Sequence, residues 1–364
     1  MNTEEPAVLV EEVKFAFGGK FALGPISIRV PRGSITVVLG SSGSGKSTLL
    51  RLIAGILEPS RGRVILCAPQ NNLPTAVSMV FQDHVLYPHL SVEENALLKF
   101  QVDRKTVDLR MGVIAELAQT LELSHLLGRT PKELSGGEKQ RAAILKTLVS
   151  GAPVWLLDEP LANLDVKTKI SVLDAVLARR RQTGATIIYV THDLEDALAI
   201  AEDVAILRGG RMLQHARLAE ISLSPAEADV VRLSSPIPPN ELRGFLVLEG
   251  KSAKVTLDIG GSVAVPIGRL HGGLQNGARV LVLIDPADLH AEPPHSDVLN
   301  ARGSFQARVK RTTRQHRFSI IEYVTVGGSL LAIERPPRFP GVGSEETLSI
   351  RSEACHVFLD ERMP

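Results

Sequence analysis

The sequence contains only two cysteines, Cys67 and Cys355, and neither has a Cys or His neighbour at metal-ligand spacing. Two isolated thiols exclude a disulfide framework, and their surroundings give no sign of a zinc site. We therefore expect both to be unpaired, unreactive thiols in a reducing compartment.

An excess of charge of one sign is also missing. The 364 residues include 41 basic and 40 acidic side chains, which gives a formal net charge of +1, and no long block of like charges occurs. This balance does not favour nucleic acid as a partner. No apolar run approaches the roughly 18 residues of a membrane-spanning helix, and the acidic N-terminus does not resemble a signal peptide. We expect neither feature in this chain.

A glycine-rich loop is the most informative feature that is present. Residues Gly40–Thr48 read GSSGSGKST, which matches the phosphate-binding pattern GxxxxGK followed by Ser. Glycines permit backbone angles that turn consecutive N–H groups around an anion. Lys46 can then reach the β- and γ-phosphates of a nucleotide, and the hydroxyl of Ser47 can ligate Mg²⁺. A plain Gly/Ser-rich turn is the alternative interpretation.

The neighbours of the loop favour the phosphate site. Ser34–Leu39 is a short β-branched run, and Thr48–Leu57 has apolar residues at helical spacing. The loop is thus expected to join a strand to a helix N-terminus, where unpaired N–H groups and the helix dipole favour phosphate.

Two regions of different texture follow along the chain. Residues 7–230 alternate short apolar strands with amphipathic helices, which indicates an α/β fold with a largely parallel sheet. Within them, residues from about 83 to 134 carry mainly helical patterns and are interpreted as a helical subdomain. A Pro-rich linker precedes residues 241–364, which are expected to form an all-β domain of small barrels. Its predicted strands are 245–248, 254–257, 262–265, 279–284, 305–310, 318–324 and 329–333.

Two adjacent carboxylates end an apolar strand. In Val154–Pro160, Asp158 and Glu159 follow the run VWLL, so they are expected at the carboxyl edge of the sheet beside the phosphate loop. Asp158 would hold Mg²⁺, and Glu159 would orient and deprotonate the water that attacks the γ-phosphorus. Two exposed acids at a strand end are the alternative.

A second Gly/Ser turn opens another helix. Ser135, Gly136 and Gly137 precede a helical run that starts near Ala142. They could bind the phosphates of a nucleotide held by another subunit, or they could form a simple N-cap turn.

With these motifs in order, the chain resembles the ATP-binding subunit of an ABC transporter, and LSGGEKQR at 134–141 is close to that family's signature sequence. The resemblance covers residues 7–230. It implies that Gln82 contacts Mg²⁺ and the attacking water, and that His192 is the switch histidine at the γ-phosphate. It also implies that Asp165 communicates across a dimer interface and that Phe17 stacks on adenine. Taken alone, Phe17 could equally be a core residue.

The resemblance further implies a homodimer that encloses two ATP molecules with Mg²⁺. Each nucleotide would be held by the phosphate loop of one subunit and by Ser135–Gly137 of the other. The expected nucleotide-binding residues are Phe17, Gly40, Ser41, Ser42, Gly43, Ser44, Gly45, Lys46, Ser47, Thr48, Ser135, Gly136, Gly137 and Asp165. The expected catalytic residues are Glu159, His192 and Gln82, and the expected metal ligands are Ser47, Gln82 and Asp158.

Partners and solute follow from the same resemblance. Tyr87, Pro88, His89 and Leu90 are expected to contact a helix of an integral membrane permease, which places the protein at the cytoplasmic face of the inner (cell) membrane. The β-rich tail resembles the OB-like (TOBE) regulatory domain of importer ATPases. Residues 283–289 occupy a turn typical of that domain, in which Asp285 stands where the family often has arginine. A periplasmic or extracellular solute-binding protein would deliver the solute.

The solute itself stays open. Ferric iron or a polyamine is slightly favoured over a sugar or an oxyanion by the overall resemblance of the tail. Two further alternatives are a soluble ABC-type ATPase, acting on nucleic acid or ribosomes, and an ATP-dependent regulatory protein not coupled to transport.

Overall fold

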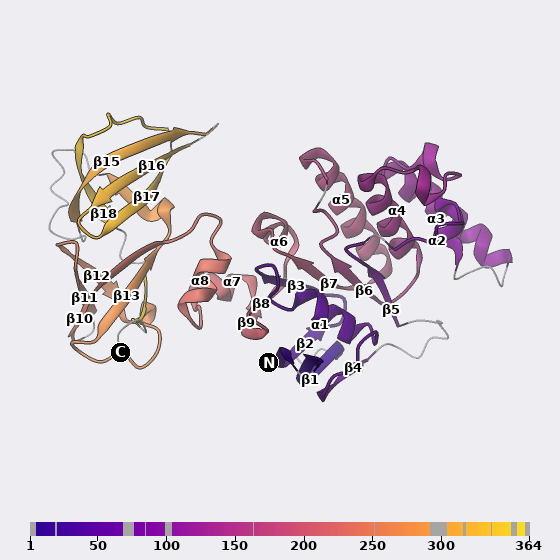
Figure 1. The fold of residues 1–364 in the computed structure, drawn as a ribbon, viewed down its shortest axis with the longest axis horizontal. Helices are drawn as coiled ribbons and strands as arrows, with labels where there is room; N and C mark the ends of the chain where they lie inside the picture. Colours follow the sequence, from indigo (N-terminus) through magenta and orange to yellow (C-terminus); the bar gives the residue numbers. More distant parts are fainter. Residues whose placement is uncertain are drawn as a thin grey trace. The chain divides into compact units, whose positions relative to one another are not determined.

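A computed structural model describes residues 5–18, 20–67, 76–83, 85–98, 104–162, 164–250, 252–291, 304–315, 318–335, 337–350 and 355–360. The chain divides into an N-terminal unit, Met1–Leu218, and a C-terminal unit, Ala219–Pro364. Figure 1 shows the elements of both. The expected limits at 230 and 241 thus differ from this division, because the short helices after Leu218 group with the β-rich part.

The N-terminal unit contains two sheets. A six-stranded sheet has the order β5-β6-β7-β3-β8-β9, in which only β9 is antiparallel to its neighbour. Its strands are β3 (Ile35–Gly40), β5 (Val77–Val80), β6 (Val154–Asp158), β7 (Thr186–Thr191), β8 (Asp203–Arg208) and β9 (Arg211–Arg217). The central strands β3, β6 and β7 are buried throughout, as near-continuous apolar runs in a covered parallel sheet are.

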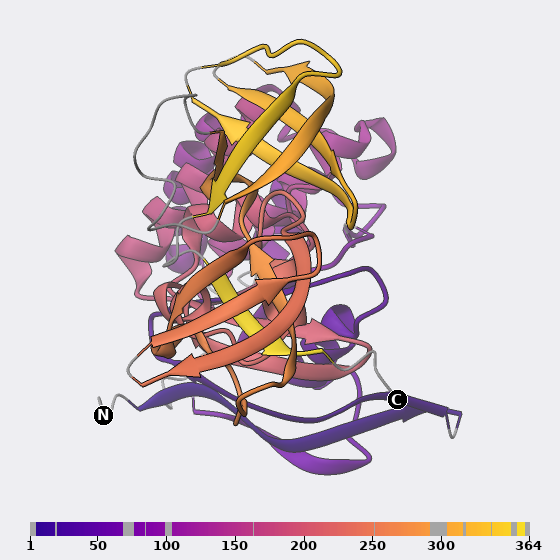
Figure 2. The same cartoon turned by 90° about the vertical axis from the view of Figure 1, so that its left-hand side faces the viewer.

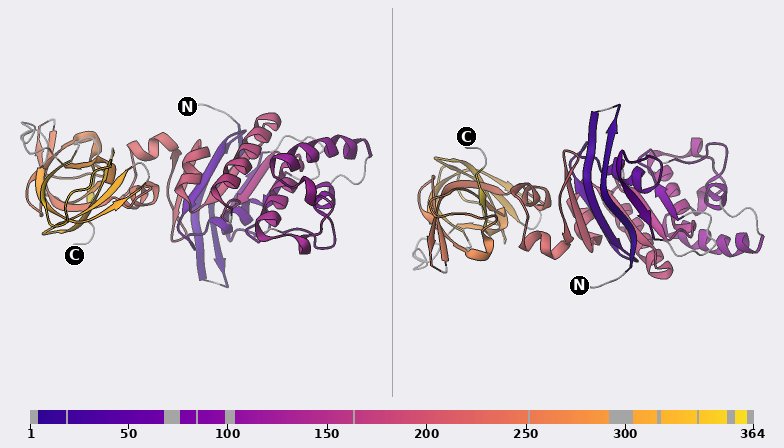
Figure 3. Two further views of the ribbon diagram at one scale, coloured as in Figure 1. Left: turned by 90° about the horizontal axis from the view of Figure 1, so that it is seen from above. Right: turned by 90° about the horizontal axis from the view of Figure 1, so that it is seen from below.

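A three-stranded antiparallel sheet of order β2-β1-β4 completes the unit. It consists of β1 (Pro6–Phe17), β2 (Lys20–Pro31) and β4 (Arg61–Leu66), and the long β1 and β2 run side by side in both views of Figure 3. Helix α1 (Lys46–Ile53) contributes Leu49, Leu50, Leu52 and Ile53 to one core shared with both sheets. This buried face anchors α1, the helix that follows the phosphate loop, against both sheets. This helix begins and ends earlier than the predicted 48–57, because Gly45, with φ of +101°, starts it and the chain turns again at Gly55, whose φ is +70°.

Helices dominate between β5 and β6, as the sequence predicts. They are α2 (Val92–Leu97), α3 (Arg104–Thr120) and α4 (Gly136–Val149), with short 3-10 turns η2 (Ser124–Leu126) and η3 (Pro131–Glu133). A capping box starts α2, since Ser91 Oγ accepts a hydrogen bond from Glu94 N and the Glu94 carboxylate accepts one from Ser91 N. Helices α5 (Val166–Thr183) and α6 (Leu194–Ile200) follow β6 and β7.

The C-terminal unit is built from two five-stranded antiparallel sheets, drawn in orange and yellow in Figure 2. The first has the order β12-β11-β10-β13-β19 and the second β14-β18-β15-β16-β17. The strands are β10 (Asn240–Glu249), β11 (Ser252–Leu257), β12 (Ser262–Pro266), β13 (Arg279–Ile284), β14 (Leu289–Ala291), β15 (Ser304–Arg314), β16 (Ser319–Thr325), β17 (Gly328–Glu334), β18 (Glu345–Ile350) and β19 (Cys355–Leu359). Helices α7 (Leu218–Leu223) and α8 (Ala228–Ser234) precede them, and η4 (Ile267–Arg269) and η5 (Pro286–Asp288) lie between strands.

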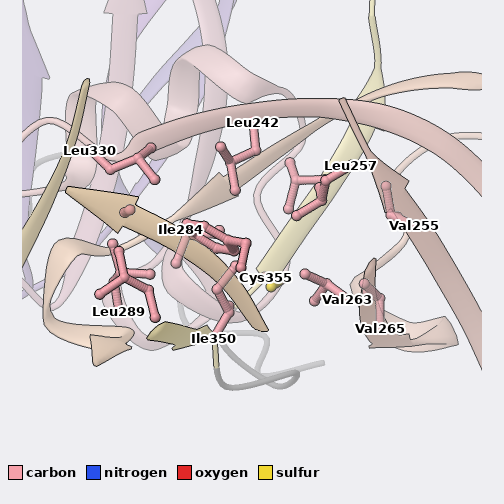
Figure 4. Close-up of a cluster of buried hydrophobic side chains, with 14 of the residues drawn as sticks. Leu242, Val255, Leu257, Val263, Val265, Ile284, Leu289, Leu330, Ile350 and Cys355 are labelled. Carbon is pink, nitrogen blue, oxygen red and sulfur yellow. The ribbon is translucent and has the colours of Figure 1, made fainter. Parts of the chain in front are cut away.

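All seven predicted strands of this unit are present, and the two sheets that contain them share one core. Leu242 and Val255 of the first sheet and Leu330 and Ile350 of the second belong to one cluster of buried side chains (Figure 4). Cys355 lies in the same cluster, where burial raises the pKa of its thiol to about 12. This thiol is therefore protonated and unreactive at neutral pH.

A buried amide joins the two sheets. Asn240 of β10 is 5 % exposed; its Nδ2 donates to the Leu331 carbonyl over 2.8 Å, and its Oδ1 accepts from Leu331 N over 2.7 Å. Because Leu331 lies on β17, one side chain satisfies both backbone groups across the gap between the sheets.

We expect Asn240→Ala to lower the free energy of opening around Leu331 by about 1–3 kcal/mol, because it leaves buried polar groups without a partner. Hydrogen exchange of the Leu331 amide in the full-length chain measures this quantity. The control is Asn276→Ala, measured at the Leu248 amide. In the unaltered chain Leu248 N donates a hydrogen bond to Oδ1 of the exposed Asn276, and the substitution removes this bond. Equal effects of the two substitutions would contradict the role given to burial.

Candidate nucleotide-binding site

The phosphate loop leaves β3 at Gly40 and enters α1 at Lys46, so the predicted strand, loop and helix are present. Gly43 and Gly45 have φ of +77° and +101°, which L side chains rarely adopt. At Gly40 the limit is space rather than φ, since a Cβ there would lie 2.3 Å from the Leu207 carbonyl oxygen of β8. Gly43 and Gly45 are therefore favoured by their backbone conformation, and Gly40 is favoured because there is no room for a side chain.

Lys46 is buried at the start of α1. Its Nζ donates to the carbonyl oxygens of Gly40 over 2.8 Å and Ser41 over 3.0 Å, within its own loop. Burial lowers the pKa of Lys46, while the negative charges of Glu159 and Asp158 oppose that shift. The ammonium group thus lies at the base of the loop, next to the carboxylates that end β6.

Ser47 and Asp158 meet across the same site. Ser47 Oγ donates to Asp158 Oδ1 over 3.0 Å, and Asp158 is only 2 % exposed. Burial raises the pKa of Asp158, and the hydrogen bond from Ser47 opposes the shift. A hydroxyl and a carboxylate are hard oxygen donors of the kind that Mg²⁺ prefers, so this pair fits the metal that the motif predicts.

Glu159 has an unusual backbone conformation. Its φ is +47°, and its N–H donates to the Val190 carbonyl of β7 over 2.9 Å. Its Oε1 lies 3.1 Å from Nδ1 of His192, which follows β7. The two side chains predicted to be catalytic are therefore in direct contact, and a strained turn holds one of them in place.

A cleft of about 490 Å³ surrounds these groups. Phe17 lies on its wall with 53 % of its surface exposed, and its ring packs edge to face on Phe15 with centroids 4.6 Å apart. This placement contradicts the alternative that Phe17 is a core residue. The lining residues are Phe17, Ala22, Ser42, Gly43, Gly45, Lys46, Ser47, Thr48, Gln82, Glu159, Gly209 and Gly210.

Three lining residues escaped the sequence analysis: Ala22, Gly209 and Gly210. Gly210 N donates to the Ser44 carbonyl over 3.1 Å, so the turn between β8 and β9 braces the phosphate loop. The available signal was the Gly-Gly pair itself, because both residues have positive φ in a tight turn.

Ser135, Gly136, Gly137 and Asp165 do not line this cleft. Ser135 is the N-cap of α4 in a capping box with Glu138, and Ser135 and Gly136 are exposed. Asp165 is the N-cap of α5, where hydrogen bonds from Thr168 lower the pKa of its carboxyl. Both turns therefore have a local capping role, and both present their first residues to solvent.

Comparison with known proteins decides the family. The model of the family "ABC transporter" matches residues 23–162. The sn-glycerol-3-phosphate import ATP-binding protein UgpC of Jannaschia sp. (strain CCS1) is 32 % identical over 347 residues, 93 % of either chain. This chain is an ATP-binding subunit of the ABC transporter family.

Other similar proteins also have names that refer to import or to ABC transporters. The maltose/maltodextrin import ATP-binding protein MalK of Salmonella typhi is 30 % identical over 98 % of this chain and 96 % of its own. MalK of Vibrio parahaemolyticus is 36 % identical over 72 % of each chain. The solved structure of cbiO1 from Clostridium perfringens, part of the ABC transporter complex cbiONQ, has a TM-score of 0.51 at 28 % identity and covers 60 % of this chain and 91 % of its own.

The chain is accordingly an ABC-type ATPase that binds ATP. None of the helices in the described part of this ATP-binding subunit combines the length and hydrophobicity that crossing a bilayer requires. Among the described residues there is also no group of three or more His, Cys, Asp or Glu side chains suited to a metal ion.

We expect Gly40→Ala to abolish measurable ATP binding, because its Cβ would collide with the Leu207 carbonyl and displace the start of the loop. Titration with a fluorescent ATP analogue measures the affinity. Gly112→Ala is the control, because Gly112 lies inside α3 with no atom within 4 Å of an added Cβ. It should bind ATP normally and be slightly more stable; weak binding by the control would contradict a local steric cause.

Proposed function

We propose that this ATPase works as a homodimer that hydrolyses Mg²⁺-ATP to energise solute import through a membrane permease, at the cytoplasmic face of the membrane. The observation that carries the proposal is the contact between Glu159 and His192 at the edge of a cleft lined by Lys46 and Ser47. Buried Asp158 accepts a hydrogen bond from Ser47 beside this cleft. These groups supply charge neutralisation, metal ligation and a base in one place.

Lys46 and the loop bind the triphosphate. The ammonium group neutralises the β- and γ-phosphates, and the loop N–H groups orient them as they do at helix N-termini. Ser47, Asp158 and Gln82 would hold Mg²⁺, which neutralises the developing charge on the phosphate oxygens when it is bound. Phe17, exposed on the cleft wall, offers its ring face to adenine.

Glu159 orients the attacking water and accepts its proton, while His192 contacts the γ-phosphate and holds the carboxylate of Glu159 through the 3.1 Å contact. Gln82, on the same cleft, orients the water from another side. The fixed turn at Glu159 keeps this carboxylate in place without reorganisation during the reaction.

Two exposed features outside the cleft support the proposed dimer. The exposed turn at Ser135 and Gly136 begins a 14-residue helix, and its backbone N–H groups can bind the γ-phosphate of a nucleotide held by a second copy. Exposed Val166 and Ile170 beside Asp165 offer apolar surface near the same interface. ATP would then join two copies, and hydrolysis would remove the contacts that close them.

A second cleft supports a permease contact. It encloses about 210 Å³ and is lined by Phe81, Tyr87, Leu98 and Lys146 among others. Buried Asn95 fixes its rim, because its side chain bonds to the backbone of Tyr87, Leu90 and Ser91. Tyr87 lines this cleft, and Pro88, His89 and Leu90 follow it along the chain, a few residues after Gln82. A helix of the partner seated there would sense the nucleotide site.

A carbohydrate-type solute is the better-supported cargo. The relatives named above import sn-glycerol 3-phosphate or maltose and maltodextrin, and they give no support to the expectation of ferric iron or a polyamine. A solute-binding protein would deliver the cargo to the permease. Similarity over 93 % of the chain, including the C-terminal unit, favours an importer subunit over a soluble ATPase or a purely regulatory protein.

We expect Glu159→Gln to lower kcat for ATP by about 100-fold or more while ATP binding is retained, because the amide cannot accept the proton of the attacking water. Size-exclusion chromatography with ATP should then show a stable dimer. Glu195→Gln is the control, since Glu195 is an exposed carboxylate in the first turn of α6. Unchanged hydrolysis in Glu159→Gln would remove this residue from the base role.

We expect Leu90→Glu to lower the membrane-bound fraction of the chain in cells about tenfold, because a charge in the segment that follows Tyr87 opposes burial against a permease helix. Binding of an ATP analogue should not change. Ile56→Glu is the control, because Ile56 is 52 % exposed after α1 and lines neither cleft. Loss of ATP binding in Leu90→Glu would contradict the role of this surface.

A further inference from the structure

Lys169 joins two helices that flank the nucleotide site. It lies on α5, where its backbone N–H donates to the carbonyl of the N-cap Asp165 over 2.8 Å. Its Nζ reaches Asp193 Oδ2 over 3.1 Å and Asp196 Oδ1 over 3.5 Å, both at the start of α6. One ammonium group thus pairs with two carboxylates from the segment that follows β7.

These carboxylates shape the turn that carries His192. Asp193 is the next residue and the N-cap of α6: its Oδ1 accepts from Glu195 N over 2.9 Å, and its N–H donates to Thr191 Oγ1 over 2.9 Å. Asp196 is 8 % exposed, one turn further along. The direction of the His192 side chain therefore depends on how this turn is fixed.

The charges of this cluster need a cation. Burial and the neighbouring charge of Asp193 raise the pKa of Asp196, while Lys169 opposes both effects. Burial lowers the pKa of Lys169, but its bonds to Asp193 and the charge of Asp196 outweigh burial and raise it. Tyr189 lies buried nearby, and its pKa is raised by burial and by the same two carboxylates. Without Lys169, two like charges would face each other in a partly buried site.

The same cluster touches the catalytic pair. A small cavity of about 50 Å³ is lined by Glu159 and His192 together with Lys169, Asp193, Asp196, Thr191 and Ala162. A displacement at Asp193 would therefore change the contact between His192 and Glu159 directly.

We propose that Lys169 is the positioning residue that holds His192 against Glu159 and links the helix capped by Asp165 to this pair. The inference rests on the catalytic roles proposed above for Glu159 and His192. Lys169 acts through Asp193 and Asp196 and has no contact with the phosphate loop in the described structure, so its loss should affect turnover and not the affinity for ATP.

The test compares steady-state ATPase kinetics of the full-length chain with Lys169→Met, Lys169→Arg and Lys169→Met/Asp196→Asn. We expect Lys169→Met to lower kcat about tenfold or more and to change KM for ATP less than about twofold. Lys169→Arg, which keeps the charge and two donors, should recover kcat to within about threefold of the unaltered chain. Adding Asp196→Asn to Lys169→Met should restore part of kcat, because it removes the repulsion between the two carboxylates.

Lys167→Met is the matched control, because Lys167 is an exposed lysine on the same turn of α5. If Lys169→Met does not fold, the inference is judged from kcat of Lys169→Arg and of the double variant, each compared with the unaltered chain. A normal kcat in Lys169→Met, or a folded Lys169→Arg as slow as Lys169→Met, would overturn the inference. Failure of the proposed function would be recognised by a different result, namely full ATPase activity of Glu159→Gln.

Discussion

The buried ammonium group of Lys46 is the charge on which the nucleotide site depends. A lysine is stable in such a place only if polar groups surround it, and here two carbonyls of its own loop accept its hydrogen bonds. Those carbonyls face inward because glycines let the loop turn, and the loop turns where β3 meets α1. The carboxylates of Asp158 and Glu159 add the opposite charge from β6. Loop, strand edge and helix are thereby fixed together by one side chain.

The order of the parallel strands brings the other polar groups of the site close to Lys46. Because β7 lies between β6 and β3, the residues after these three strands emerge side by side at one edge of the sheet. Gly40, Asp158, Glu159 and His192 are far apart in the sequence yet share this edge. The order and spacing of the buried strands thus set the distances between the site residues, and the polar side chains of the site lie at the carboxyl ends of these strands.

Short motifs with a mechanism were predictable from the sequence. The glycine-rich loop, the paired acids and the Gly/Ser turn at Ser135 that opens a helix are local patterns, and the structure contains each of them. The Gly-Gly pair at 209–210 is a local signal for a turn, but its place beside the phosphate loop comes from tertiary packing around the β8–β9 hairpin, which that signal does not reveal. The shared core of the two C-terminal sheets was missed for the same reason, since strand patterns do not say which sheets face each other. The roles of individual site residues stay predictions.

The position of β19 has a consequence for biosynthesis. This strand ends at Leu359, pairs with β13 and places Cys355 and Val357 in the core of the C-terminal unit. A ribosome adds residues in order, so this strand emerges only after the strands β14 to β18 of the second sheet. The first sheet of the unit therefore cannot be completed before the second has been made, whereas the N-terminal unit ends at Leu218 and can fold earlier. Until β19 is made, β13 has an unpaired edge, which favours aggregation, so nucleotide binding is expected to mature before the C-terminal unit does.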